Sequence, residues 1–426
     1  MTTAPAQSTS MPAERPLGVA EHFMWLMNQN RPTHSATAVE VAGPTEVHEW
    51  RAALNTLQRR HALLGARIRD SGNGPRLSFG HAAQIPLRVT DLAATGWQHE
   101  LATEMRHGVD AATMPPVRAV LLYSPERCAL VLVAHHAVVD GLSQAYLVRD
   151  LLTLVSGGSI EGAAEGHHPG HPVDHFLARE IAAAATTLPS DMEIPLSDRP
   201  GIYRRPDPDA ALSIDAATLS RTQTAALRER ARAEGTTVHG AVATAALGAA
   251  AELNADWSTV PLRVHSPLSL RGLLPAPAEG MGNILAPATT AQVGKWSDPW
   301  EAARSFTDTL APFRHKSALL QSLALWTGVF QNRPAPADMA GMLAAAAPHE
   351  LLLTNLGALP IGTSYGSLTL KSLWGPSVLF GFEGEQTLGL STLAGTLRIL
   401  HTSFSPVPEL LESTRERLLS ATGGTG

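Results

Sequence analysis

Hydrophobic residues fall at helical spacing in two stretches of the first half of the chain. In the segment 45–64, Trp50, Leu54 and Leu57 recur every three or four residues, with polar residues between them. This spacing places them on one face and predicts an amphipathic helix. A second helical pattern runs over 142–155 and stops at two consecutive glycines, which commonly end helices.

Other stretches have the pattern of β-strands. VRAVLLY (117–123) and ALVLVAH (129–135) are short apolar runs, and the turn predicted between them, Ser124-Pro125-Glu126-Arg127, includes a proline. They predict a β-hairpin that ends at a pair of histidines. Further strands are predicted over 258–271 and late in the chain. The late ones lie in HELLLTNLG, LTLKSLW, TLGLSTL and TLRILHTSF.

The remaining helices belong to the second half, and a change of composition separates the two halves. TQTAALRERARAE predicts one helix, a second follows from Thr236 or Thr237, and VPELLESTRERLLSA predicts the last. Both halves mix helices and strands without regular alternation, which predicts two α/β halves. We predict a disordered tail over 1–14, a first half over 15–180, a Gly/Pro/Ser/Asp-rich linker over 181–210 and a second half over 211–426.

Composition and charge exclude several classes of function. The net charge of −6, with no stripe of lysine and arginine, gives no basis for nucleic-acid binding. No apolar run approaches 18 residues and the first residues do not resemble a signal peptide, so we expect a soluble cytoplasmic protein without a membrane span. The single cysteine, Cys128, excludes an internal disulfide and is expected to be a buried bystander.

The histidine pair at the end of the hairpin carries the clearest candidate chemistry. His135 and His136 are followed by Asp140 and Gly141, at a turn from strand to helix. Side chains alternate faces along a strand, so the two imidazoles should point in opposite directions, one into packed interior and one into a cavity. That geometry argues against a shared metal ion, and no ligand set completes a metal site.

A neutral imidazole can remove a proton from a hydroxyl or an amine while that group attacks a carbonyl. Asp140 is expected to orient the turn rather than to act as a base. If it is buried it needs a cationic partner, preferably the planar fork of an arginine.

The string HHAVVDG resembles the H-H-x-x-x-D-G motif of the condensation-domain and CoA-dependent acyltransferase superfamily. The likeness is strongest to the polyketide-associated acyltransferases that esterify phthiocerol-type diols. It rests also on PLGVAEHFMWLMNQN near the start, on TNLG late in the chain, and on the position of the motif about a third of the way along. The D-F-G-W-G segment of plant acyltransferases and many condensation domains is missing, which disfavours those branches.

The resemblance implies two chloramphenicol-acetyltransferase-like α/β halves that form a V-shaped pseudo-dimer around a central tunnel. It implies that His136 is the general base, supported by His135, and that Asp140 is structural. The segment SPLSLR is similar to the strand that carries the arginine partner of this aspartate, which nominates Arg271.

TNLG resembles the segment that supplies an oxyanion hydroxyl in dihydrolipoyl acyltransferases. This nominates Thr354, with Asn355 second, although TNLG could equally be the end of a strand with a turn. Gly141 either keeps the tunnel open or only permits the turn.

The expected activity is an ester-forming O-acyltransferase with no bound cofactor and no covalent acyl-enzyme. Its donor would be a thioester on coenzyme A or on the phosphopantetheine arm of an acyl carrier protein. Its acceptor would be a hydrophobic alcohol, such as a polyketide or lipid alcohol, and the protein would be a monomer. Two alternatives remain: a free-standing condensation enzyme that forms an amide, and a non-catalytic module that docks carrier proteins.

Three other motifs are interpreted as bystanders. GTSYG (362–366) matches a nucleophile elbow, but a strand pattern follows its serine where a helix is required. GMGN (280–283) lacks the context of a dinucleotide fingerprint. His167, His168, His171 and His175 lie in a stretch with the composition of a solvated loop.

Overall fold

The structure is a computed structural model that describes residues 13–70, 72–80, 83–160, 171–188, 196–204, 207, 210–274, 280–292 and 296–423. Its α-helices are α1 Val19–Asn30, α2 Val47–Arg60, α3 Trp97–Arg106, α4 Gly141–Val155, α5 Val173–Phe176, α6 Ala178–Ala185, α7 Arg221–Ala233, α8 Val238–Leu253, α9 Pro299–Leu310, α10 Lys316–Gln331, α11 Pro336–Ala346 and α12 Leu410–Ala421. Most of the predicted tail, residues 1–12, lies outside the described residues.

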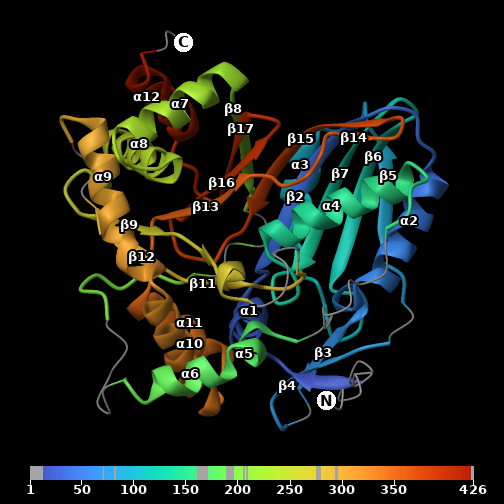
Figure 1. The fold of residues 1–426 in the computed structure, drawn as a ribbon, viewed down its shortest axis with the longest axis horizontal. Coiled ribbons are helices and arrows are strands. Elements are labelled where there is room, and N and C mark those ends of the chain that lie inside the picture. Colours follow the sequence, from blue (N-terminus) through green and yellow to red (C-terminus); the bar gives the residue numbers. More distant parts are fainter. Residues whose placement is uncertain are drawn as a thin grey trace, which may run out of the picture.

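Two six-stranded mixed sheets form the two halves, which lie side by side in Figure 1. The strands are β1 Glu14–Pro16, β2 His34–Ala42, β3 Arg67–Asp70, β4 Pro75–Ser78, β5 Leu87–Asp91, β6 Val117–Ser124, β7 Arg127–His135, β8 Ser213–Leu219, β9 Leu262–His265, β10 Leu268–Ser269, β11 Leu285–Ala286, β12 Thr289–Gln292, β13 Leu351–Ala358, β14 Ser364–Tyr365, β15 Leu368–Ser377, β16 Gln386–Leu393 and β17 Thr396–Ser403. The first sheet has the order β14-β15-β2-β7-β6-β5 and the second has the order β12-β9-β13-β16-β17-β8. The predicted two-part α/β architecture is confirmed.

The first sheet is covered by helices on both faces, because its central strands are apolar on both sides. Along β7, Leu130 and Leu132 share a core with the apolar faces of α2 and α4, whereas Val131 and Val133 pack toward α3. Such a continuous apolar run is typical of a strand that is buried on both faces. The hairpin predicted before the histidine pair is present as β6 and β7, with Ser124 opposite Arg127.

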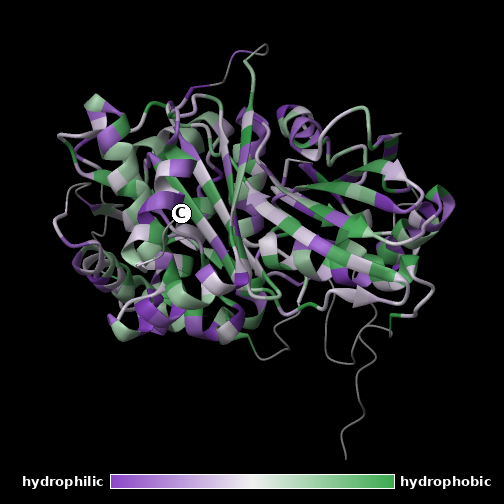
Figure 2. Cartoon of the chain, turned by 90° about the horizontal axis from the view of Figure 1, so that it is seen from above, coloured by the Kyte–Doolittle hydropathy of each residue, from purple (hydrophilic) through white to green (hydrophobic). Residues whose placement is uncertain are grey.

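Helices α7, α8, α9 and α12 gather on the outer side of the second sheet (Figure 1). Viewed from above in Figure 2, the strands between the helices are striped with hydrophobic and hydrophilic residues. Helices α1, α10 and α11 lie together below the two sheets in Figure 1. None of the described helices is both long and apolar enough to cross a membrane.

The second half of the chain contributes a strand to the sheet of the first half. Strand β15 belongs to the second half of the sequence but pairs with β2 of the first sheet, from Thr369 opposite Ala42 to Ser377 opposite Ala36. It also runs against β16, where a Cβ atom at Gly389 would lie 2.0 Å from the carbonyl oxygen of Pro376. Glycine is therefore required at this crossing, because the backbones of the two sheets approach each other too closely for a side chain.

The segment predicted as a linker is partly helical. Helix α6 extends to residue 185 and packs on α10, with Ile181 in the core of the second half. Residues 189–195, 205–206 and 208–209 of the predicted linker lie outside the described residues.

Candidate active site

The predicted turn from strand to helix places the histidine pair at the centre of the molecule. His135 is the last residue of β7 and lies opposite His34 of β2, and its Nδ1 accepts a hydrogen bond from the backbone N–H of Ala137 at 3.1 Å. Burial lowers the pKa of His135 to about 3, so this imidazole is neutral. The two imidazoles point in different directions, as predicted. Of the two, only His136 lines the central cavity, which is described below.

The His136 imidazole is fixed in one tautomer by the turn itself. Its Nδ1 lies 2.9 Å from the carbonyl oxygen of Val139, which can only accept, so Nδ1 carries the proton. Burial lowers its pKa below 6.5, against the opposite effect of the Val139 carbonyl and the charge of Asp140. Among the described residues Nε2 has no hydrogen-bond partner, so its lone pair is free to take a proton at neutral pH.

Asp140 forms a buried ion pair with Arg271, as the resemblance of SPLSLR implies. The guanidinium donates from Nη1 to Oδ2 at 2.6 Å and from Nη2 to Oδ1 at 2.9 Å. The carboxylate also accepts from the backbone N–H groups of Ser143, where it caps α4, and of Ile284. Burial alone would raise the pKa of Asp140, but the charge of Arg271 and these hydrogen bonds outweigh it and lower the pKa.

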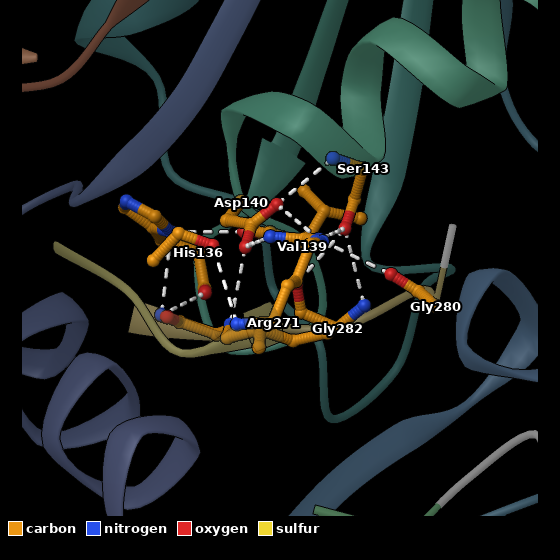
Figure 3. A network of polar contacts seen from close by, with 10 residues as sticks. His136, Val139, Asp140, Ser143, Arg271, Gly280 and Gly282 are labelled. Atoms are coloured by element: carbon orange, nitrogen blue, oxygen red, sulfur yellow. Dashed lines mark hydrogen bonds and ion pairs between the residues drawn. The ribbon is translucent and has the colours of Figure 1, made fainter. Parts of the chain in front are cut away.

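The segment 280–284, from the second half of the chain, packs against the turn that carries His136 and Asp140 (Figure 3). The carbonyl of Gly282 accepts from the Asp140 backbone N–H and the Ser143 hydroxyl, both at 3.0 Å. The Asn283 amide donates to the His136 carbonyl oxygen at 2.9 Å. This segment contains GMGN, which the sequence analysis set aside as an unrelated motif.

Gly141 is explained by crowding. Its backbone is not in the left-handed region, so the turn itself does not require glycine. A Cβ atom there would lie 2.7 Å from Leu356 and 2.8 Å from Pro376, and Gly141 lines the cavity. The absence of a side chain therefore allows Leu356 and Pro376 to pack closely against the start of α4.

The central cavity has a volume of about 100 Å³ and receives residues from both halves of the chain. Most of its wall is apolar, and the larger apolar side chains come from α1, α10 and the segment after β15. They include Phe23, Trp326, Val378 and Phe380. An apolar cavity with a few polar groups in its wall is typical of sites for small hydrophobic ligands.

The structure brings Thr354 into this cavity but not Asn355. Neighbouring residues of β13 face opposite sides, so Thr354 lines the cavity. Asn355 borders a separate recess beside His239 and Arg314, and its Oδ1 accepts from the Gly357 backbone N–H at 2.8 Å. Of the two nominated oxyanion donors, only Thr354 shares a cavity with His136.

Unlike GMGN, the GTSYG motif and Cys128 do not line the central cavity. Ser364 is exposed on the two-residue strand β14 and no helix follows it. Cys128 is buried, which raises the pKa of its thiol to about 12. His167 and His168 lie outside the described residues, and within the described part of the chain no cluster of three or more His, Cys, Asp or Glu residues could hold a metal ion.

Sequence profiles of two known families match the two halves. The condensation-domain profile matches residues 16–163, which include the histidine motif. The profile described as the C-terminus of phthiocerol/phthiodiolone dimycocerosyl transferase matches residues 208–379, which include Arg271 and Thr354.

Among curated proteins, the chain is 32% identical over 149 residues to a probable non-canonical nonribosomal peptide synthetase, CymA, from Salinispora arenicola. It is 32% identical over 152 residues to the phosphinothricin tripeptide synthetase PhsC from Streptomyces viridochromogenes. Each match covers 33% of this chain but only 2% and 14% of these much longer relatives, respectively.

Solved structures share the fold over nearly the whole length of both chains. Polyketide synthase associated protein 5 from Mycobacterium tuberculosis superposes with a TM-score of 0.64 at 20% identity, covering 96% of this chain and 99% of that one. The first condensation domain of the CDA synthetase gives a TM-score of 0.68 at 16% identity, covering 98% of both.

Proposed function

Because the chain belongs to the superfamily of condensation domains and polyketide-associated acyltransferases, we propose that it is an acyltransferase that esterifies a hydrophobic alcohol. The single observation that carries the proposal is the state of His136. Its imidazole is neutral, its tautomer is set by Val139, and its Nε2 is unpartnered among the described residues where it meets an apolar cavity.

In the proposed reaction Nε2 of His136 removes the proton of the acceptor hydroxyl while the oxygen attacks the thioester carbonyl carbon. The C–O bond forms and the carbonyl π electrons move onto oxygen, which gives a tetrahedral oxyanion. When the oxyanion collapses, the C–S bond breaks and the thiolate takes the proton from His136. The products are an ester and a free thiol, and the imidazole is neutral again.

Asp140 and Arg271 serve this step by holding the turn. The carboxylate is saturated by the guanidinium and by two backbone N–H groups, so it has no lone pair directed to the substrate. Its role is positioning: it fixes the start of α4 and, through the segment 280–284, the backbone of His136.

Thr354 is the proposed donor to the oxyanion. Its side chain faces the cavity, and no described residue accepts its hydroxyl proton. A hydroxyl placed in this way can stabilise negative charge on the tetrahedral intermediate, because the apolar surroundings strengthen the interaction.

The profile match over 208–379 favours ester formation, since the family it describes is a transferase of phthiocerol and phthiodiolone, whereas the condensation-domain match fits an amide product equally well. The donor in either case would be a thioester, of coenzyme A or of a carrier protein. The apolar side chains of Phe23, Trp326 and Phe380 in the cavity wall suit an acceptor with a hydrophobic chain.

The test is a competition between matched acceptors. The protein is supplied with acyl-CoA thioesters from acetyl to palmitoyl and with 1-octanol or octylamine, and thiol release and product are measured for wild type and His136→Ala. Ester formed only by the wild type supports the proposal. Amide formed in preference to ester would select the condensation alternative. If wild type and His136→Ala released thiol at the same rate with every donor, and also with acylated carrier proteins, the enzymatic proposal would be overturned.

A further inference from the structure

A second polar cluster lies in the wall of the central cavity and has no part in the mechanism above. His265 and His349 both line the cavity, together with the apolar side chains described above. His265 is the last residue of β9 and stands opposite Leu352 of β13, two residues before Thr354. The cluster therefore belongs to the same wall as the proposed oxyanion donor.

His349 is anchored from behind by a buried carboxylate. Its Nε2 lies 3.2 Å from Oε1 of Glu385, and both side chains are almost completely buried. Glu385 also accepts from the backbone N–H of Phe380 at 2.9 Å and of Gly381 at 2.7 Å. Burial alone would raise the pKa of Glu385, but the hydrogen bond from His349 and nearby positive charge lower it, so the anchor is ionised.

His265 stacks on the anchored ring and offers one free nitrogen. The ring centroids of His265 and His349 are 5.0 Å apart, with 26° between the planes. Nδ1 of His265 lies 2.9 Å from the Thr289 hydroxyl, whereas Nε2 has no hydrogen-bond partner among the described residues. Burial, and to a smaller extent the neighbouring His349, lowers the pKa of His265 well below 6.5, so its ring is neutral.

A neutral imidazole with one unpaired nitrogen is an unfavourable component of an apolar wall. Nε2 of His265 is open to the cavity, so a ligand that fills the cavity without pairing this nitrogen would leave it unsatisfied, at a cost of about 1–3 kcal/mol. The Thr289 hydroxyl, the stacked His349 and its carboxylate anchor hold the ring in one orientation. This support is expected if a ligand atom satisfies the free nitrogen.

We propose that His265 is a specificity-determining residue that hydrogen-bonds an oxygen atom carried on the apolar chain of the substrate, away from the reacting centre. The inference rests on the proposed function, which identifies the substrates as an acyl thioester and a hydrophobic alcohol. The oxygen belongs to a hydroxyl or a carbonyl group, since a neutral imidazole can donate to either or accept from the former. Its source is either the acyl chain of the donor or the acceptor alcohol.

Binding tests this inference without requiring turnover. Dissociation constants are measured by calorimetry for 1-octanol and for octanediols with the second hydroxyl at position 3, 5 or 7, and likewise for octanoyl-CoA and hydroxyoctanoyl-CoA. The compound with its second oxygen at one of these positions should bind the wild type roughly 10-fold more tightly than the parent compound. This is the gain expected from one buried hydrogen bond. The series in which the preference occurs identifies the source of the oxygen.

The ratio of the two dissociation constants is the readout in the variants. His265→Phe should reduce the ratio to about one, and His265→Gln, which keeps a donor and an acceptor, should restore part of it. Thr289→Val, at a partly exposed position, should weaken the ratio by freeing the ring and serves if His265→Phe does not fold. No preference in either series, or a preference that survives in His265→Phe, would overturn the inference. His136→Ala should keep the ratio while losing turnover, so the proposed function and this inference fail separately.

Discussion

Removal of Arg271 is the perturbation whose effect follows most directly from the contacts. Arg271→Ala would leave the Asp140 carboxylate buried, 1% exposed, with only the two backbone N–H groups of Ser143 and Ile284. It would also remove the guanidinium contacts to the Ser143 hydroxyl and the Gly280 carbonyl. Breaking a buried pair from one side typically costs about 3–5 kcal/mol, because one charge remains uncompensated.

The assay is thermal unfolding followed by circular dichroism at pH 7, together with turnover. For a chain of 426 residues the unfolding entropy is about 0.9 kcal/mol/K, so a loss of 3–5 kcal/mol lowers Tm by about 3–6 °C if unfolding is cooperative. The matched control is Arg304→Ala, which removes a half-exposed arginine paired with Glu234 and should cost about 0–1 kcal/mol.

The pH dependence of the same pair has a definite sign. The pKa of Asp140 is depressed in the folded state, so its contribution is present above the unfolded pKa of about 3.9 and is lost as pH falls through the folded value. In Arg271→Ala the stranded carboxylate can be neutralised by a proton. The Tm difference should therefore be largest near pH 7 and shrink toward pH 4. An Arg271→Ala protein with wild-type Tm and turnover would refute the reasoning.

Four further predictions concern the cavity and the turn. The kcat/KM of the wild type should be independent of pH above 6.5 and fall only below it, because the lowered pKa keeps His136 neutral; a pH–rate profile with its midpoint above 7 would contradict this. Thr354→Val should lower kcat by about 10²–10³-fold with little change in Tm, whereas Thr354→Ser should retain most activity; equal activity of both variants would leave only a structural role. Gly141→Ala should raise KM for bulky acceptors more than for ethanol, because the methyl group would displace Pro376, which lines the cavity, and KM values measured over a series of acceptors check this. Asn283→Leu removes the donor to the His136 carbonyl, so it should lower kcat while leaving Tm close to the wild-type value. Parallel kinetic and melting measurements check this.

The sequence predicted those parts of the site that lie within one continuous segment. The strand, the turn and α4 follow each other directly, so alternation along β7 was enough to predict that the two imidazoles face opposite sides, and the resemblance of HHAVVDG then selected His136. Arg271 was found only through the resemblance of SPLSLR, because nothing in its spacing shows that it meets Asp140, 131 residues away.

What could not be predicted depends on contacts between distant segments. Asn283 and Gly282 meet the turn because a loop of the second half folds over it, and their residue types carry no signal of that approach. Helices α10 and α11 were not predicted, since their apolar residues serve both the core and the cavity and leave no clear polar face. The exchange of β15 into the first sheet is likewise a tertiary event, although its strand pattern was recognised.

The most direct test of the account is the kcat/KM of His136→Ala with the preferred acyl thioester and 1-octanol. The control is His61→Ala, which changes a histidine at the C-terminal end of α2 that pairs with Asp150 outside the cavity. The account predicts a loss of about 10²–10⁴-fold for His136→Ala, with a Tm close to that of the wild type, and less than a twofold change for His61→Ala. A folded His136→Ala protein that keeps near-normal turnover would contradict the assignment of His136 as the general base.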